Sequence, residues 1–329
     1  MSNLINIIEK PSADEIYLIA GWHQWADAGS ISSGLPEYLI ELTKAEKVAE
    51  LKPNGYYLFQ IPGTHHFFRP EVKFKDGYPK SLRTKKNEFY FTKIKTENGS
   101  KGLLIFLGDE PHINESFYVD AFFEVVREFG VKRTAAVGGV FGEMPYDQDR
   151  QISCSYSMKK MKEELDSYAV KFSNYEGGAT IGSYFAAQAN KLERELVVFN
   201  AFVPAYEFAF YNHDESDLAT MGHIDDIDDG EIEPQGLRIE NDYRAWYDLM
   251  RRVNHMFGIN IDLSDLDRQS DELTDALKRE LLSLSVKAPQ LEVESYLKKV
   301  EIGFTEMPFM PLDTLWEEEL GDLFGDSED

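Results

Sequence analysis

The sequence predicts an α/β fold in which a mostly parallel sheet is buried between helices. Four apolar runs show no alternation of polar and apolar residues, and helix-like stretches separate them. Strands covered on both faces read as such continuous runs, and consecutive parallel strands need a crossover connection, usually a helix. We expect one sheet to contain the strands Ile16–Ala20, Leu103–Leu107, Thr134–Val137 and Leu196–Asn200.

The stretches between these runs are of two kinds. A helical pattern that includes Leu35 and Leu39 follows the first run, and further periodic segments lie at 117–129 and 182–192. Between residues 47 and 95, large apolar residues instead occupy alternate positions, which is typical of antiparallel strands or hairpins.

The strand pattern ends near residue 212. Residues 213–240 are acidic and contain a proline and three glycines, which predicts a long loop or insert. Three helices are then expected at Tyr243–Phe257, Leu263–Leu284 and Leu291–Val300. The predicted organisation is an α/β core at 1–212, an acidic loop or insert at 213–240, a helical extension at 241–305 and an acidic amphipathic tail at 306–329.

The tail is predicted to form a short amphipathic helix. Its apolar residues recur at helical spacing and share one face. They are Leu312, Leu315, Trp316, Leu320, Leu323 and Phe324. A helix this short, with two glycines, is not stable alone in water. It therefore docks either on the helical extension of its own chain or on a partner or neighbouring subunit, and in the second case Trp316, Leu320 and Phe324 are the expected recognition residues.

Composition excludes several classes of function. The 329 residues include 34 basic and 59 acidic side chains, a net charge of −25. Such a surface repels phosphate backbones and anionic lipids, so we expect neither nucleic-acid nor membrane binding. The single cysteine, Cys154, excludes an intrachain disulfide and multi-cysteine metal sites. The chain shows no secretory leader and no apolar span of membrane length, so the expected location is the cytoplasm.

Charge is distributed unevenly along the chain. Residues 69–101 contain ten Lys or Arg against four Asp or Glu, whereas residues 213–240 and 301–329 each contain ten acidic residues. These segments are either solvated blocks or partners that pair within the chain or between subunits.

Short motifs indicate no cofactor and no metal. The glycines between Gly177 and Gly182 have phosphate-loop spacing, but Ser183 stands where the essential lysine belongs, so a tightly packed helix start explains them better. The acidic run from Asp225 fails as a calcium loop, because its third position is Ile227. Catalytic signatures such as G-x-S-x-G and H-E-x-x-H do not occur.

Polar and aromatic residues follow all four predicted strands. Ligands of open α/β sheets bind outside the carboxyl ends of the strands, so these residues could meet in one crevice. The crevice candidates are Trp22, Trp25, Asp27, Glu110, Gly139, Glu143 and Tyr206. If the crevice is catalytic, the candidate groups are Asp27, Glu110, His112 and Arg150.

Each candidate also has a structural explanation. Asp27 could cap the following helix, and Glu110 could complement a helix dipole beside a proline. Trp22 and Trp25 could be core residues. The sequence leaves both explanations open for each residue.

An ordered set of short motifs resembles the proteasome assembly chaperone 2 family, particularly its bacterial members of unassigned role. The set comprises Trp25 to Gly29, Gly108 to Pro111, a glycine-ended strand before Pro145, Tyr175 to Gly177 and Val203 to Tyr206. The resemblance covers about residues 15–210 and extends weakly to 291–296.

The resemblance implies a three-layer α/β/α domain with phosphorylase/hydrolase-like topology and a C-terminal helical extension. It also implies a homo-oligomer, often a trimer, and an unidentified protein partner. Two family histidines are replaced here, since Pro145 is followed by Tyr146 and Ala205 precedes Tyr206. The family's hydrophobic-Tyr-X ending for docking on proteasomes is absent from the end of this sequence.

Two hypotheses of function follow. The first is a non-enzymatic protein-binding or assembly factor that resembles proteasome assembly chaperones. The alternative is a hydrolase or phosphorylase-like enzyme that uses the strand-end crevice. A crevice plugged by aromatic residues favours the first, and a crevice with a strongly perturbed carboxylate favours the second.

Overall fold

The computed structural model describes residues 4–59, 69–96, 99–207, 236–307 and 309. One ten-stranded sheet organises the fold, with the order β1-β3-β6-β7-β2-β8-β11-β9-β10 and β12 paired to β11. Its strands are β1 Ile5–Ile7, β2 Ile16–His23, β3 Glu46–Leu51, β6 Asn87–Thr96, β7 Gly99–Asp109, β8 Val131–Gly142, β9 Ile152–Tyr156, β10 Lys171–Phe172, β11 Glu195–Glu207 and β12 Gly236–Arg238.

The central strands of this sheet are the four that the apolar runs predict. β7, β2, β8 and β11 are adjacent and parallel. Antiparallel β3 and β6 extend the sheet beyond β7, as the alternating pattern between residues 47 and 95 predicts. The predicted α/β fold with a mostly parallel sheet is therefore confirmed.

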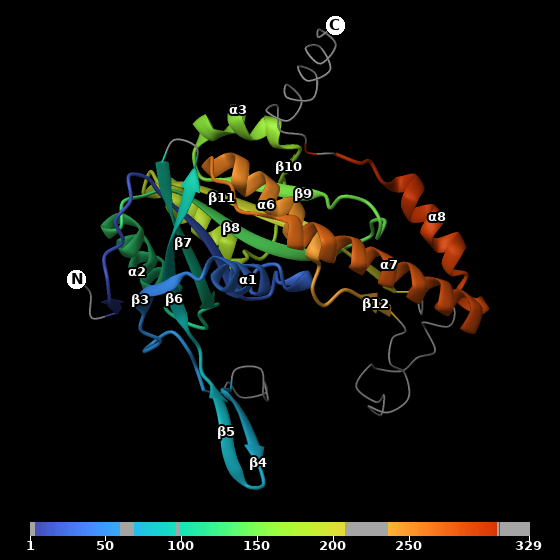
Figure 1. Ribbon diagram of the computed structural model, residues 1–329, viewed down its shortest axis with the longest axis horizontal. Coiled ribbons are helices and arrows are strands. Elements are labelled where there is room, and N and C mark those ends of the chain that lie inside the picture. Colours follow the sequence, from blue (N-terminus) through green and yellow to red (C-terminus); the bar gives the residue numbers. More distant parts are fainter. Residues whose placement is uncertain (1–3, 60–68, 97–98, 208–235, 308, 310–329) are drawn as a thin grey trace, which may run out of the picture.

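Helices cover both faces of the sheet. The helices are α1 Gly34–Thr43, α2 Glu115–Glu128, α3 Lys162–Leu165, α4 Ile181–Lys191, α6 Tyr243–Phe257, α7 Ser264–Lys287 and α8 Val293–Gly303. Ile19 on β2 packs in a cluster with residues of α1 and α6, whereas its neighbours Leu18 and Ala20 pack with α2 and α4. This alternation follows from the two-residue period of a strand and produces the three layers. Figure 1 shows α1 and α6 crossing in front of the sheet.

The predicted C-terminal helices are present as α6, α7 and α8. Helix α6 buries Trp246, Leu249 and Val253 at helical spacing against the sheet, so it is part of the main core. Asp242 caps its first turn and Gly258, at φ 55°, ends it. Helix α8 packs on the end of β11 through a smaller cluster. The boundaries that divide the chain into four segments stay predictions.

The central strands are longer than the apolar runs indicate. β2 continues to His23, β7 to Asp109 and β8 to Gly142, and β11 stays paired with β8 as far as Pro204. Trp22 and Gly139 consequently lie inside strands rather than in the loops after them, and so does Tyr206. Glycines and polar residues at these strand ends hide the continuation from a pattern of apolar residues.

A separate two-stranded hairpin projects from the body of the protein (Figure 1). It consists of β4 Glu71–Lys75 and β5 Tyr78–Arg83, and every residue of both strands is exposed. Val72, Phe74 and Leu82 are among its exposed apolar side chains. A lone two-stranded hairpin is marginally stable in water. Packing against another surface would therefore stabilise this element.

Candidate functional site

A cavity of about 490 Å³ opens beside the carboxyl ends of β2 and β8 and along the middle of β11. Its lining comes from the loop after β2, the end of β8, the middle of β11, strand β9 and the segment that leads into α4. The lining residues are Trp25, Ala26, Ala28, Gly139, Val140, Phe141, Ser153, Ser155, Ser173, Tyr175, Thr180, Ser183, Val198, Asn200 and Phe202. Its position is the one that ligand sites of open α/β sheets occupy.

The register of β9 and β11 determines which side chains reach the cavity. Asn200 lies opposite Ser153, and Val198 lies opposite Ser155. The residues between them, such as Cys154 and Phe199, point to the other face and pack with α1 and α6. The same two-residue period that builds the core therefore aligns a row of polar side chains on the cavity side of the sheet.

Gly139 is the crevice candidate whose role depends on its lack of a side chain. It pairs with Asp27 in an isolated parallel bridge. A Cβ atom at Gly139 would lie 2.1 Å from the carbonyl oxygen of Ala28, so only glycine allows the loop after β2 to approach β8. This close approach forms one wall of the cavity.

Trp22, near the end of β2, and Trp25, in the loop after β2, have opposite environments. Trp22 is 0% exposed, and its indole N–H donates to the Tyr118 hydroxyl at 3.1 Å. Trp25 is 75% exposed and lines the cavity, as do Phe141 and Tyr175, which are 46% and 63% exposed. Trp22 is thus a core residue, and the cavity mouth carries three exposed aromatic side chains.

Asp27 acts as a cap for the turn that leads into α1. Its carboxylate accepts the backbone N–H groups of Ser32 and Ser33, at 2.7 and 3.0 Å, and the Ser33 hydroxyl at 2.6 Å. Burial raises its pKa, and the Ser33 and Ser32 hydrogen bonds partly offset that rise. Asp27 lies beside the cavity, but its oxygens are directed at the turn.

The carboxylate of Glu110 accepts fewer hydrogen bonds than that of Asp27. One of its carboxylate oxygens accepts the backbone N–H of Trp25 at 3.4 Å, and burial raises its pKa. His112 contacts another segment: its Nδ1 accepts the Leu58 N–H at 3.0 Å, and burial lowers its pKa. The loop after β7 therefore places one carboxylate, but not the imidazole, against the loop that contains Trp25.

Arg150 is a structural residue in a buried polar network between the loop after β8 and α6. Its side chain and that of Asp242 are both 0% exposed, with Nε and Oδ2 2.8 Å apart. It also donates to the carbonyl oxygens of Tyr146 and Gln148 at 3.0 and 2.8 Å. All of these contacts hold the loop and the start of α6 together.

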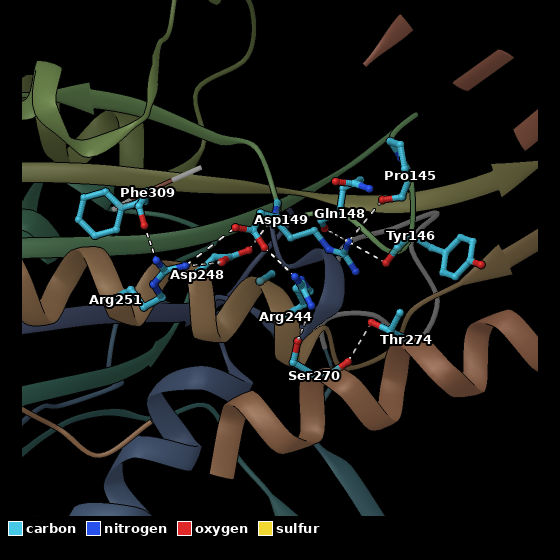
Figure 2. Close-up of polar contacts among 12 residues, drawn as sticks. Pro145, Tyr146, Gln148, Asp149, Arg244, Asp248, Arg251, Ser270, Thr274 and Phe309 are labelled. Carbon is cyan, nitrogen blue, oxygen red and sulfur yellow. Dashed lines mark hydrogen bonds and ion pairs between the residues drawn. The ribbon is translucent and has the colours of Figure 1, made fainter. Parts of the chain in front are cut away.

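The surrounding network extends to α7, as Figure 2 shows. Arg244 on α6 donates to Asp149 at 2.7 Å and to the Ser270 hydroxyl at 3.5 Å. Asp248 on the same helix accepts the backbone N–H of Arg150 at 2.8 Å. Burial raises the pKa of Asp248 to about 6.

Glu143 and Tyr206 face α8 rather than the cavity. The Tyr206 hydroxyl donates to the Met144 carbonyl at 2.7 Å, and its ring packs edge-on against Tyr296. Glu143 accepts the Tyr296 hydroxyl at 3.2 Å. The structure thus brings Trp25 and Gly139 to the cavity, with Asp27 and Glu110 beside it.

Sequence reasoning missed most of the polar lining. Ser153 and Ser155 come from β9, which no apolar run announces, and Asn200 lies at the end of a predicted strand. The glycine cluster before α4 was the available signal, since Thr180 caps that helix at the cavity edge. Trp316, Leu320 and Phe324 lie outside the described residues.

Two further findings concern metals and membranes. Within the described part of the chain, no three His, Cys, Asp or Glu side chains are grouped so that they could hold a metal ion. Over the same residues, no helix has the length and apolar character needed to cross a bilayer.

Comparison with known proteins shows which family and which solved structures the chain is similar to. The PAC2 family model matches residues 19–281. A PAC2 family protein from Streptomyces avermitilis is 17% identical, with a TM-score of 0.64 over 86% of this chain and 99% of its own. A proteasome-assembly chaperone homologue from Mycobacterium tuberculosis is 17% identical, with a TM-score of 0.60 over 80% and 94%.

An archaeal proteasome activator from Pyrococcus furiosus is 20% identical, with a TM-score of 0.52 over 84% of this chain and 97% of its own. At these identities the likeness establishes the fold. A comparison with curated proteins found no match.

Proposed function

This chain belongs to the PAC2 family, and from that membership we propose that it is a protein-binding or assembly factor whose partner docks at the strand-end cavity. The observation that carries the proposal is the group of exposed aromatic residues Trp25, Phe141 and Tyr175 around the cavity mouth. Aromatic residues are enriched at protein interfaces and supply much of their binding energy.

The hydrogen bonds and ion pairs that the candidate catalytic groups make within the chain support the same proposal. Asp27 is directed at the turn before α1, His112 at the Leu58 backbone and Arg150 at Asp242. Solved structures with this fold include a proteasome-assembly chaperone homologue and a proteasome activator. We extend the assembly role to this chain without assigning a proteasome as its partner.

The test is partner recovery from a native lysate with intact-mass analysis. The variants are Trp25→Ala combined with Phe141→Ala and, as a control, Ile302→Ala, an 86% exposed apolar residue on α8. We expect the wild-type and control chains to recover the same proteins and the double variant to lose them. Equal recovery by the double variant, or recovery of the bare chain by all three, contradicts the proposal.

We also propose that the chain self-associates through the β4–β5 hairpin, with the trimer as the form that the family resemblance implies. The hairpin exposes Val72, Phe74 and Leu82, and it belongs to the basic segment 69–101 of a chain with net charge −25. The basic side chains of this hairpin are complementary in charge to another copy of an acidic chain, and its exposed apolar side chains could be buried in the contact. We also propose a cytoplasmic location. The free, buried thiol of Cys154 is compatible with a reducing compartment.

A second candidate function is a hydrolase or phosphorylase-like enzyme. The observation that favours it is Glu110, whose pKa is raised by burial and whose carboxylate has one long hydrogen bond, from Trp25. Turnover of ester, peptide or nucleoside substrates should then be lost in Glu110→Gln and kept in Glu115→Gln, an exposed glutamate at the start of α2. Activity that survives Glu110→Gln excludes this role for the residue.

A further inference from the structure

Among the residues that the structure describes, the lining of the strand-end cavity contains no charged side chain. The fifteen described lining residues include no Asp, Glu, Lys, Arg or His, although charged residues make up 28% of the chain. A charged group enclosed by these lining residues would lose its hydration without a charged partner among them, and such burial is costly. An occupant of this cavity is therefore uncharged where it is enclosed.

Several of the polar lining groups are already hydrogen-bonded within the protein. Thr180 and Ser183 bond to one another at the start of α4, Ser173 accepts the N–H of Tyr175, and the Tyr175 hydroxyl donates to the Gly178 carbonyl. These groups complete the local turn and helix cap. They have little capacity left for an occupant.

Three polar side chains remain. Within the described ranges, the hydroxyls of Ser153 and Ser155 and the amide of Asn200 have no hydrogen-bond partner. Gly138 makes room for this amide, since a Cβ atom there would lie 2.4 Å from the Asn200 Oδ1. A hydroxyl and a side-chain amide each donate and accept, which matches the N–H and C=O of a peptide group.

The remainder of the cavity suits an apolar side chain. Val140, Val198 and Phe202 are lining residues, and Trp25 and Phe141 stand at the mouth. The volume of about 490 Å³ lies within the range of roughly 300–1,000 Å³ that ligand sites occupy. Interface centres are likewise depleted of charge and enriched in aromatic residues.

We propose that the cavity binds an uncharged stretch of a partner polypeptide, which inserts one apolar side chain and bonds its peptide groups to Ser153, Ser155 and Asn200. This inference rests on the proposed protein-binding function and specifies what the site recognises. The aromatic mouth holds the inserted side chain, and the serine and asparagine row aligns the backbone.

The test uses four blocked amino-acid amides as probes of the full-length chain. N-acetyl-leucinamide and N-acetyl-phenylalaninamide are uncharged, whereas the N-acetyl amides of glutamic acid and lysine carry one charge each. Saturation-transfer NMR reports binding. We expect the two uncharged probes to bind saturably and to compete with each other, and the two charged probes to bind at least about tenfold more weakly.

Variants connect the binding to the row of polar side chains. Asn200→Leu keeps the side-chain size, removes the amide and should weaken the uncharged probes about tenfold. Ser285→Val on α7, outside the cavity, is the control and should bind like the wild type. If Asn200→Leu does not fold, Ser155→Ala serves as the second variant, with the same direction of effect.

Three outcomes overturn the proposal. They are equal or tighter binding of a charged probe, no binding of any probe, and a small molecule that co-purifies with the wild type and is lost from Asn200→Leu. If the probes fail while partner recovery still depends on Trp25 and Phe141, the protein-binding function stands and only the class of recognised segment falls. If partner recovery fails while the probes bind, the protein-binding function falls, and the polypeptide proposal that rests on it falls as well; only the preference of the cavity for uncharged ligands stands.

Discussion

At the scale of single residues, the polar side chains that the sequence offers as catalytic make hydrogen bonds or ion pairs within the fold. Arg150 is the clearest case, because it is buried with Asp242 and also bonds to backbone carbonyls of its own loop. Removing one partner of a buried ion pair leaves the other charge uncompensated, which is far more costly than losing an exposed pair.

We therefore predict that Arg150→Met lowers the free energy of unfolding by about 3–5 kcal/mol. Arg268→Met is the matched control, since Arg268 pairs with Asp265 and Glu272 on the exposed face of α7. It should cost far less than Arg150→Met, because solvent screens an exposed pair. Denaturant unfolding followed by circular dichroism measures both, and similar losses for the two variants would contradict the structural role of Arg150.

A second prediction concerns Asp248 and pH. Burial, followed by the neighbouring Asp149, raises its pKa from 3.8 to about 6. Between these values the folded state holds the proton and the unfolded state does not, so the free energy of unfolding falls as pH rises from about 4 to about 6.

Asp248→Asn should flatten the pH dependence of stability in this interval, because it removes the titrating carboxyl group. The asparagine oxygen can still accept the backbone N–H of Arg150. Asp275→Asn on the exposed face of α7 should leave the profile unchanged. Unfolding curves at a series of pH values decide the matter, and a steeper profile for Asp248→Asn would refute the prediction.

At the scale of elements, the open question is which surface the C-terminal tail docks on. Residues 312–324 have the spacing of one amphipathic face in the sequence. They lie outside the described residues, so the two docking alternatives for this segment stay predictions.

Truncation after Pro311 distinguishes the alternatives. If the tail docks on its own chain, the melting temperature falls and partner recovery follows stability. If it is a recognition helix, the melting temperature stays constant while partner recovery or self-association is lost. Calorimetry and pull-down of the same preparations supply both measurements, and no change in either would refute both versions.

At the scale of the whole molecule, the uneven charge and the projecting hairpin point to assembly. We predict that the chain sediments as an oligomer at micromolar concentration and physiological salt. Phe74→Ser combined with Leu82→Ser should convert it to a monomer without lowering its melting temperature, because both side chains are exposed, at 61% and 63%. A wild-type chain that sediments as a monomer would disprove self-association, and an oligomeric double variant would exclude the hairpin.

Local sequence patterns determined the central strands and the first C-terminal helix of this protein. Continuous apolar runs identified all four central strands, and helical spacing identified α6 with its observed ends, because burial on one or both faces imposes a period that the sequence must follow. A cavity near the strand ends was predictable for the same reason, since parallel strands all end at one edge.

Only the tertiary structure decided which side chains form the site. Trp22 and Trp25 are three residues apart, yet one lies in the core and the other at the cavity mouth, because the strand ends between them. Tyr206 and Arg150 were directed elsewhere by α8 and α6, which contact them from distant parts of the sequence. Ser153 and Asn200 meet through the pairing of β9 with β11, a register between strands that neither strand's own sequence contains.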